Sequence, residues 1–125
     1  MRGRNCLVES LDVLTVALEF ADSAVVIRLS GELDLSTGPQ LGEAFADAAV
    51  SDPALVVLDL HALTFIDAAG LRAVLRGNQQ FDKRLIVRGA SSRIRRLFTV
   101  AGVERELQFD RPPLGLVSSG REARP

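Results

Sequence analysis

The sequence predicts a single α/β domain in which a mixed β-sheet packs against helices. Its 125 residues fit one domain, and a hydrophobic content of 47% is typical of a globular rather than a disordered chain. The apolar patterns follow the order of a β-hairpin and then α-β-α-β-α-β, so right-handed crossovers place the helices along the sheet. We therefore expect a flexible N-terminal arm over residues 1–11, the domain over 12–113 and a disordered tail over 114–125.

The N-terminal part of the domain is predicted to be a hairpin followed by a helix. Residues 14–20 alternate in polarity and are rich in β-formers, 21–23 form a turn, and 24–31 form the second strand. Ser36 or Thr37 then offers a capping oxygen to a helix that ends before Pro53. This helix carries one apolar stripe, consisting of Leu41, Ala44, Phe45 and Ala48.

The second half of the domain alternates strands with short helices. Residues 54–60 are almost wholly apolar, which is the pattern of a strand covered by helices on both faces. A corner at 61–67 leads into a helix from about Ala68 to Asn78, with Arg76 among its outward positions. A strand over 85–87, a helix that begins after Ser91 and stops at Gly102, and a short strand over 107–109 complete the pattern.

The composition argues against an enzyme, a cofactor site and a membrane segment. Cys6 and His61 are the only cysteine and histidine, so a disulfide, a metal cluster or a Ser-His-Asp engine lacks the residues it needs. Asp34 and Asp67 could be read as an acid/base pair, but no nucleophile or Gly-rich phosphate loop accompanies them. No apolar run approaches the roughly 20 residues that span a bilayer, and no signal peptide is recognised, so we expect a cytoplasmic protein without cofactor.

The net charge of −1 conceals an asymmetry along the chain. Residues 1–67 hold 11 acids and 3 bases, whereas residues 68–125 hold 5 acids and 12 bases. Such polarity can orient a partner, although solvated surface charges are the simpler explanation. The densest basic cluster is Arg93, Arg95 and Arg96, but with a negative total charge and no reading helix we expect no nucleic acid partner.

The corner at residues 64–71 is the most distinctive feature. Asp67 lies where a buried strand meets a helix, so its carboxylate can accept the free N–H of Ala69 or Gly70. The small residues at 68–70 let another backbone or a phosphate approach, and Phe65 and Ile66 are expected to anchor the loop in the core. An ordinary capped helix with small residues for tight packing remains the alternative.

Taken together and in order, several segments resemble the STAS domain, the fold of bacterial anti-sigma factor antagonists. They are residues 31–34, 58–60, 65–71, 85–87, 93–98 and 101–103, and the resemblance spans about 14 to 110. It implies a regulatory module in a partner-switching pathway that catalyses nothing. It also implies binding to an anti-sigma factor with a histidine-kinase-like ATPase domain, which releases a sigma factor for transcription.

The resemblance also implies a switch that this sequence lacks. In the family, the partner kinase phosphorylates a Ser or Thr directly after the corner Asp and thereby breaks the complex. Here that position is Ala68 and the next is Ala69, and neither has the oxygen that carries a phosphate. Thr64, Ser36 and Thr37 are the nearby hydroxyls that could substitute, with capping or solvation as the alternative role.

The predicted partner-binding surface combines the corner with the loop after the second hairpin strand. Its residues are Asp34, Thr37, Thr64, Asp67, Ala68, Ala69, Gly70, Leu71 and Arg72. A role as a scaffold subunit of a larger signalling assembly or membrane-transporter complex is the alternative function. Weak nucleotide binding and a homodimer also stay open at this point.

Overall fold

The computed structural model describes residues 6–10 and 13–110 and confirms the predicted mixed α/β fold. The strands are β1 (Cys6–Ser10), β2 (Leu14–Ala21), β3 (Ala24–Leu33), β4 (Leu55–Ile66), β5 (Leu85–Arg88) and β6 (Gln108–Phe109). The helices are α1 (Gly38–Ala49), α2 (Ala68–Gln80) and α3 (Ser92–Val100), followed by the short 3-10 helix η1 (Glu104–Glu106).

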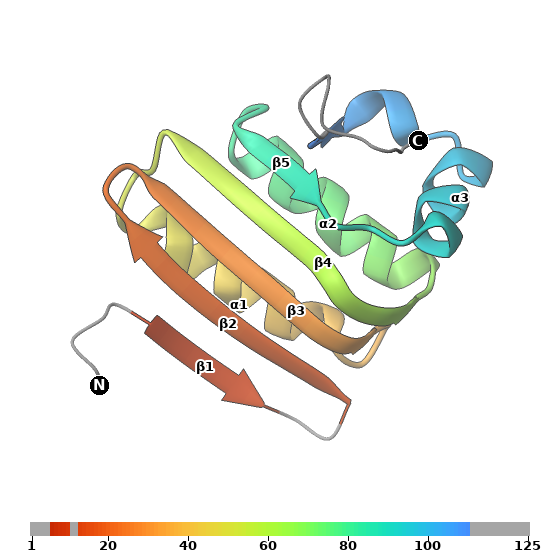
Figure 1. The fold of residues 1–125 in the computed structure, drawn as a ribbon, viewed down its shortest axis with the longest axis horizontal. Helices are drawn as coiled ribbons and strands as arrows, with labels where there is room; N and C mark the ends of the chain where they lie inside the picture. Colours follow the sequence, from red (N-terminus) through yellow and green to blue (C-terminus); the bar gives the residue numbers. More distant parts are fainter. Residues whose placement is uncertain (1–5, 11–12, 111–125) are drawn as a thin grey trace, which may run out of the picture.

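The six strands form one sheet in the order β1-β2-β3-β4-β5-β6 (Figure 1). The pairs β1–β2 and β2–β3 are antiparallel, and the remaining pairs are parallel. The predicted hairpin is therefore confirmed, and Asp22 adopts a positive φ of 51° in its tight turn. Because β3, β4 and β5 follow one another in space as in sequence, right-handed crossovers place α1 and α2 on the same face, behind the sheet in Figure 1.

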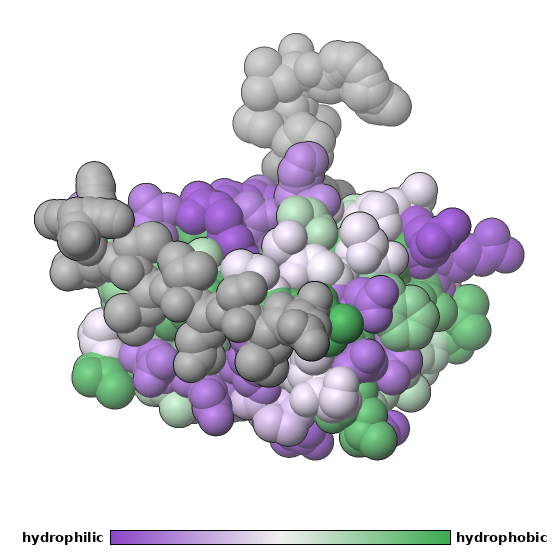
Figure 2. All heavy atoms as spheres, turned by 90° about the horizontal axis from the view of Figure 1, so that it is seen from below, coloured by the Kyte–Doolittle hydropathy of each residue, from purple (hydrophilic) through white to green (hydrophobic). Residues whose placement is uncertain are grey.

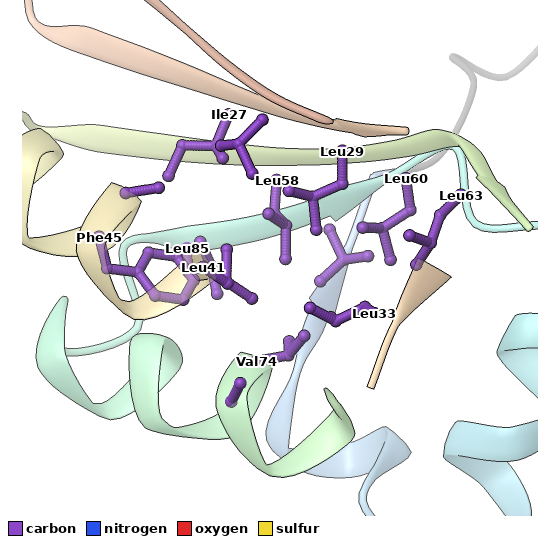
Figure 3. Close-up of a cluster of buried hydrophobic side chains, with 14 of the residues drawn as sticks. Ile27, Leu29, Leu33, Leu41, Phe45, Leu58, Leu60, Leu63, Val74 and Leu85 are labelled. Atoms are coloured by element: carbon purple, nitrogen blue, oxygen red, sulfur yellow. The ribbon is translucent and has the colours of Figure 1, made fainter. Parts of the chain in front are cut away.

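The hydrophobic core lies between the sheet and these two helices. Figure 3 shows Leu29 and Leu58 pointing from the sheet toward Phe45 of α1 and Val74 of α2. The predicted stripe of α1 is confirmed, since Leu41, Ala44, Phe45 and Ala48 are all buried. The rings of Phe45 and Phe81 meet edge to face, with 5.9 Å between their centroids.

The opposite face of the sheet carries charged residues beside apolar ones and is not covered by α1 or α2, which corrects the expectation that residues 54–60 are covered on both faces by helices. Asp59 of β4 lies between two arginines of neighbouring strands, at 3.7 Å from Nε of Arg28 and 3.4 Å from Nη2 of Arg88. Arg28 also pairs with Glu19 at 2.7 Å, so an ion-paired row crosses four strands. Val57 also lies on this face, and it is buried (8% exposed) between its register neighbours Val26 and Ile86. Because Val57 is apolar as well, the segment is almost wholly apolar in sequence although α1 and α2 cover only its other face.

The N-terminal segment also differs from its prediction. Residues 1–11 were expected to be a flexible arm, but Cys6–Ser10 pair with β2 as the antiparallel edge strand β1. An edge strand is held mainly by its backbone hydrogen bonds, and five residues are too few for a polar/apolar alternation to stand out. Residues 1–5 and the predicted disordered tail at 114–125 lie outside the described residues.

Candidate functional site

Two loops meet at the carboxyl ends of the parallel strands β3 and β4, at the lower right of Figure 1. Leu33 and Ile66 are register partners in neighbouring strands. Asp34 and Asp67 are the next residues, so they leave the sheet next to each other. The amide of Asp67 donates to the carbonyl of Leu33 at 3.3 Å and ties the two loops together. We call residues 34–37 and 64–72 the corner surface, and it contains every residue of the predicted partner-binding set.

Asp67 caps α2 as predicted. Its Oδ1 accepts a hydrogen bond from the amide of Gly70 at 2.8 Å, which satisfies one of the free N–H groups at the helix start. Gly70 itself is buried. A Cβ at this position would lie 2.4 Å from the carbonyl oxygen of Leu33, so there is no space for a side chain. The backbone that approaches Gly70 therefore belongs to the protein's own β3.

Asp34 organises the loop between β3 and α1. Its Oδ1 accepts from the amides of Ser36 and Thr37, at 3.0 and 3.1 Å, and from the hydroxyl of Ser36 at 2.8 Å. The hydrogen bond from the Ser36 side chain is the leading cause that lowers the pKa of Asp34 below its ordinary 3.8, with the Thr37 hydrogen bonds acting in the same direction.

Thr37 supports this loop from inside. It is the N-cap residue of α1, yet its side chain caps no helical N–H. Instead its Oγ1 accepts from the amide of Asp34 at 2.8 Å and lies 2.9 Å from the carbonyl of Glu32, to which it donates. With 2% of Thr37 exposed, its side chain can serve a docking surface only by holding Asp34 in place.

Phe65 is exposed, which corrects the expectation that it anchors the loop in the core. The pairing of β3 with β4 shifts register twice, between Arg28 and Ser30 and between Gly31 and Glu32. Each shift adds a residue to β4, so its inward positions after Leu60 come at Leu63 and Ile66. Ile66 is buried as expected, whereas Phe65 is 47% exposed.

Two apolar side chains of the corner surface were missed by the sequence analysis. Six large hydrophobic residues are exposed in the described part of the chain, and two of them, Leu35 at 75% and Phe65 at 47%, belong to this surface. Figure 2, in which the molecule of Figure 1 is seen from below, shows hydrophobic residues as single spots and, toward its right-hand end, as a group beside hydrophilic ones. The sequence did contain a signal for Leu35. A single leucine between Asp34 and Ser36 belongs to no apolar stripe, which indicates that it is not a core residue.

The remaining predicted residues divide into exposed and packed ones. Ala68, Thr64 and Arg72 are exposed, and Ala69 is partly exposed. The Thr64 hydroxyl donates to the carbonyl of Gly31 at 3.0 Å. Leu71 is 8% exposed and packs in the core.

The described residues form neither a cluster of metal ligands nor a helix that could span a membrane. No group of three or more His, Cys, Asp or Glu side chains within 6–10 and 13–110 is arranged to hold a metal ion. None of the helices in those ranges has the length and hydrophobicity needed to cross a bilayer.

Comparison with known proteins gives a consistent set of relatives. The family model described as "Mlab, STAS domain" matches residues 16–116. An anti-sigma-B factor antagonist from Staphylococcus aureus is 29% identical over 94 residues, which cover 73% of this chain and 87% of that protein.

Solved structures agree with this result. An anti-sigma factor antagonist from Mycobacterium paratuberculosis superposes with a TM-score of 0.72 at 26% identity, covering 85% of this chain and 92% of that one. The unphosphorylated form of SpoIIAA, an anti-sigma factor antagonist and Bacillus cell fate determinant, gives a TM-score of 0.64 at 25% identity, covering 77% and 88%. The same protein has also been solved in a phosphorylated form, with a TM-score of 0.59.

Proposed function

Because the chain belongs to the STAS domain family, whose model it matches over residues 16–116, we propose that it is an anti-sigma factor antagonist. In this proposal it is a cytoplasmic, non-enzymatic regulator of transcription. It binds an anti-sigma factor that carries a histidine-kinase-like ATPase domain, and binding frees a sigma factor. The relatives named above as anti-sigma factor antagonists support this role.

The observation that carries the proposal is the composition of the corner surface. Leu35 and Phe65 offer apolar area, and Ala68 keeps the start of α2 open to a close approach. Asp34 and Asp67 bond their own loops through Oδ1, and within the described part of the chain no hydrogen bond is made by their Oδ2 atoms. These oxygens are available to amide or basic donors of a partner, so an apolar contact flanked by donors is the chemistry that fits.

We infer further that phosphorylation at position 68 does not control this docking. Ala68 and Ala69 have no hydroxyl, although a relative of the same fold exists in a phosphorylated form. A complex formed through this corner would therefore not be released by a phosphate at the start of α2.

A native pull-down with mass spectrometry tests the proposed function. The full chain, used as bait in its own cell extract, is expected to capture an anti-sigma factor or sigma-linked kinase. Capture of transporter subunits without any anti-sigma factor would instead favour the scaffold alternative. Recovery of neither class would contradict both.

A matched pair of variants tests the surface. Leu35→Ser is expected to weaken capture about tenfold, which corresponds to about 1.4 kcal/mol, because Leu35 is 75% exposed and a partner that covers it would bury most of its side chain. Val50→Ser is the control, since Val50 is 86% exposed and lies at the other end of α1. Equal capture by the two variants would place the docking surface elsewhere.

A further inference from the structure

Helix α3 has an exposed face that carries both positive charge and apolar side chains. Leu97 is 42% exposed and Val100 is 76% exposed. Arg93 and Arg96 are exposed as well, and the four positions share one side of the helix because they are spaced i, i+3, i+4 and i+7. We call these four residues the basic face of α3. Another side of the helix packs in the core, so the basic face is available to a partner.

Arg95 shows which arginine of α3 serves the domain itself. Its guanidinium carbon lies 4.2 Å from the centre of the Phe109 ring, and its Nη2 lies 3.3 Å from Oε2 of Glu104. Arg93 and Arg96, in contrast, form no ion pair within the described part of the chain. The basic face therefore fits a partner that brings acidic groups beside small or apolar ones.

Helix α1 has an exposed face of the opposite charge. Glu43, Ala46 and Asp47 are exposed at spacings i, i+3 and i+4, on the side of the helix that faces away from its buried stripe. We call these three residues the acidic face of α1. Neither carboxylate forms an ion pair with another residue that the structure describes. This helix contains no basic residue, and α3 contains no acidic one.

The two faces match each other in spacing and in size. The two arginines of the basic face are about one helical turn apart, and so are the two carboxylates of the acidic face. When the faces lie against each other, each arginine can meet one carboxylate, and Leu97 can pack against the small side chain of Ala46.

The two faces belong to different parts of the molecule. Figure 1 shows α1 behind β2 and β3 and α3 at the right-hand side, and both faces are exposed, so a single chain does not join them. The chain as a whole has the same polarity, since residues 1–67 hold 11 acids and 3 bases whereas residues 68–125 hold 5 acids and 12 bases. This polarity favours an arrangement in which the acidic part of one copy meets the basic part of another.

We propose that copies of this chain associate through the acidic face of α1 in one copy and the basic face of α3 in another. The contact is heterologous, so each copy contributes a different surface to it. Because it consists of few side chains and most of the charged ones are exposed, the association is weak and decreases with added salt. Both faces lie outside the corner surface, so this contact is separate from the proposed docking of an anti-sigma factor.

Reversing the charge of one face at a time tests the proposal. One variant carries Glu43→Arg and Asp47→Arg, and the other carries Arg93→Glu and Arg96→Glu. Sedimentation velocity of the full wild-type chain is expected to show self-association as its concentration rises. Each variant should need an about tenfold higher concentration for the same degree of association, because like charges then face each other. A wild type that is still monomeric at about 1 mM overturns the proposal.

The variant with all four substitutions is the matched control, because its net charge equals that of the wild type. Its two faces attract each other again with exchanged signs, so it should associate like the wild type. An equimolar mixture of the two charge-reversed variants should also associate, since each offers the face that the other needs. If the wild type associates but both the fourfold variant and the mixture stay monomeric, α1 and α3 are not the two sides of the contact.

A change in apolar contact gives an independent test. Leu97→Ser is expected to weaken self-association about threefold to tenfold, because a second copy would cover the exposed part of this side chain. Val13→Ser is the control, since Val13 has a similar exposure of 39% but lies before β2, outside both helices. Equal effects of the two substitutions contradict the proposed contact.

A lipid surface is the other occupant that a basic and apolar helix face could take. Cosedimentation with vesicles of phosphatidylserine and phosphatidylcholine distinguishes it from a second copy. The proposal expects no vesicle binding that depends on Arg93 and Arg96. A wild type that stays monomeric but binds these vesicles, and loses this binding in the variant with Arg93→Glu and Arg96→Glu, overturns the proposal in favour of a membrane.

Discussion

At the scale of single residues, Gly70 determines how closely α2 approaches β3 at the corner surface. A Cβ at this site would lie 2.4 Å from the Leu33 carbonyl oxygen and 3.0 Å from Cγ1 of Ile66. The glycine therefore lets the start of α2 rest against the end of β3, which keeps Asp67 beside Asp34. The sequence indicated that small residues matter here, but it could not show that the neighbouring backbone is internal, because that contact is between distant parts of the chain.

Gly70→Ala is expected to lower the free energy of unfolding by about 1 to 3 kcal/mol, because the added methyl group has no space. Gly42→Ala is the control, since Gly42 lies in the interior of α1, where a Cβ would meet no other atom within 4 Å. That variant should gain up to about 1 kcal/mol from reduced backbone entropy. Urea unfolding measures both, and equal effects would contradict the close approach of β3 to α2.

Asp34 leads to a pH prediction. Hydrogen bonding, led by that from Ser36, holds its folded pKa below 3.8, so its contribution to stability is present above that value. The contribution is lost as the pH falls through the lower folded pKa. Ser36→Ala is expected to move the pKa of Asp34 upward, measured by NMR titration of the carboxyl carbon. An unchanged pKa in this variant would show that the Ser36 hydroxyl is not the main cause.

At the scale of elements, apolar spacing predicted the helices well but predicted only part of β4. The stripe of α1 and the cap of α2 depend on local spacing and are visible in the sequence. Beyond Leu60, however, the inward residues Leu63 and Ile66 are three apart, which is not the two-residue period of a regular strand. Register shifts arise from pairing with β3 and are not visible in the sequence, so residues 61–67 were interpreted as a corner although β4 continues to Ile66.

The caps of α2 and α3 allow binding to be separated from stability. Asp67→Lys removes the cap of α2 and places a positive charge at the positive helix end, so it should cost about 1 to 2 kcal/mol of stability and abolish anti-sigma factor capture. Ser91 caps α3, because its Oγ accepts a hydrogen bond from the Ile94 amide at 3.2 Å. Ser91→Ala removes this cap and should cost about 1 kcal/mol of stability.

The two variants are compared by urea unfolding and by pull-down. Ser91→Ala should retain full capture, because Ser91 lies outside the corner surface. If both variants lose capture to the same degree, the loss reflects stability alone. Gross unfolding of Asp67→Lys would show that Asp67 is chiefly structural.

At the scale of the whole molecule, α1 and α2 cover only one face of the sheet, and the sequence did not reveal this division. The apolar run in β4 suggested helices on both faces, but the strand order places α1 and α2 on one side. On the other side Asp59 joins Arg28 to Arg88, and its Oδ1 accepts from the His61 amide at 2.9 Å. Predicting this face requires the strand order, which depends on the complete topology.

Asp59→Ala is expected to cost about 1 to 3 kcal/mol of stability, because the His61 amide loses a charged acceptor and two arginines lose their common partner. Glu19→Ala, which removes one exposed end of the row, should cost less than about 1 kcal/mol. Thermal unfolding at low and high salt distinguishes them. Equal costs would show that the Asp59 contacts matter no more than a surface pair.

The register shifts of β4 make the orientation of the corner depend on chain length. Between Leu60 and Ile66 the strand has two residues more than regular pairing with β3 requires. Deletion of an extra residue removes one register shift and lets Phe65 and Ile66 keep their partners Glu32 and Leu33, whereas a deletion that leaves both shifts in place turns the following side chains to the opposite side. The length of this stretch therefore decides which side chains the end of β4 presents at the corner surface.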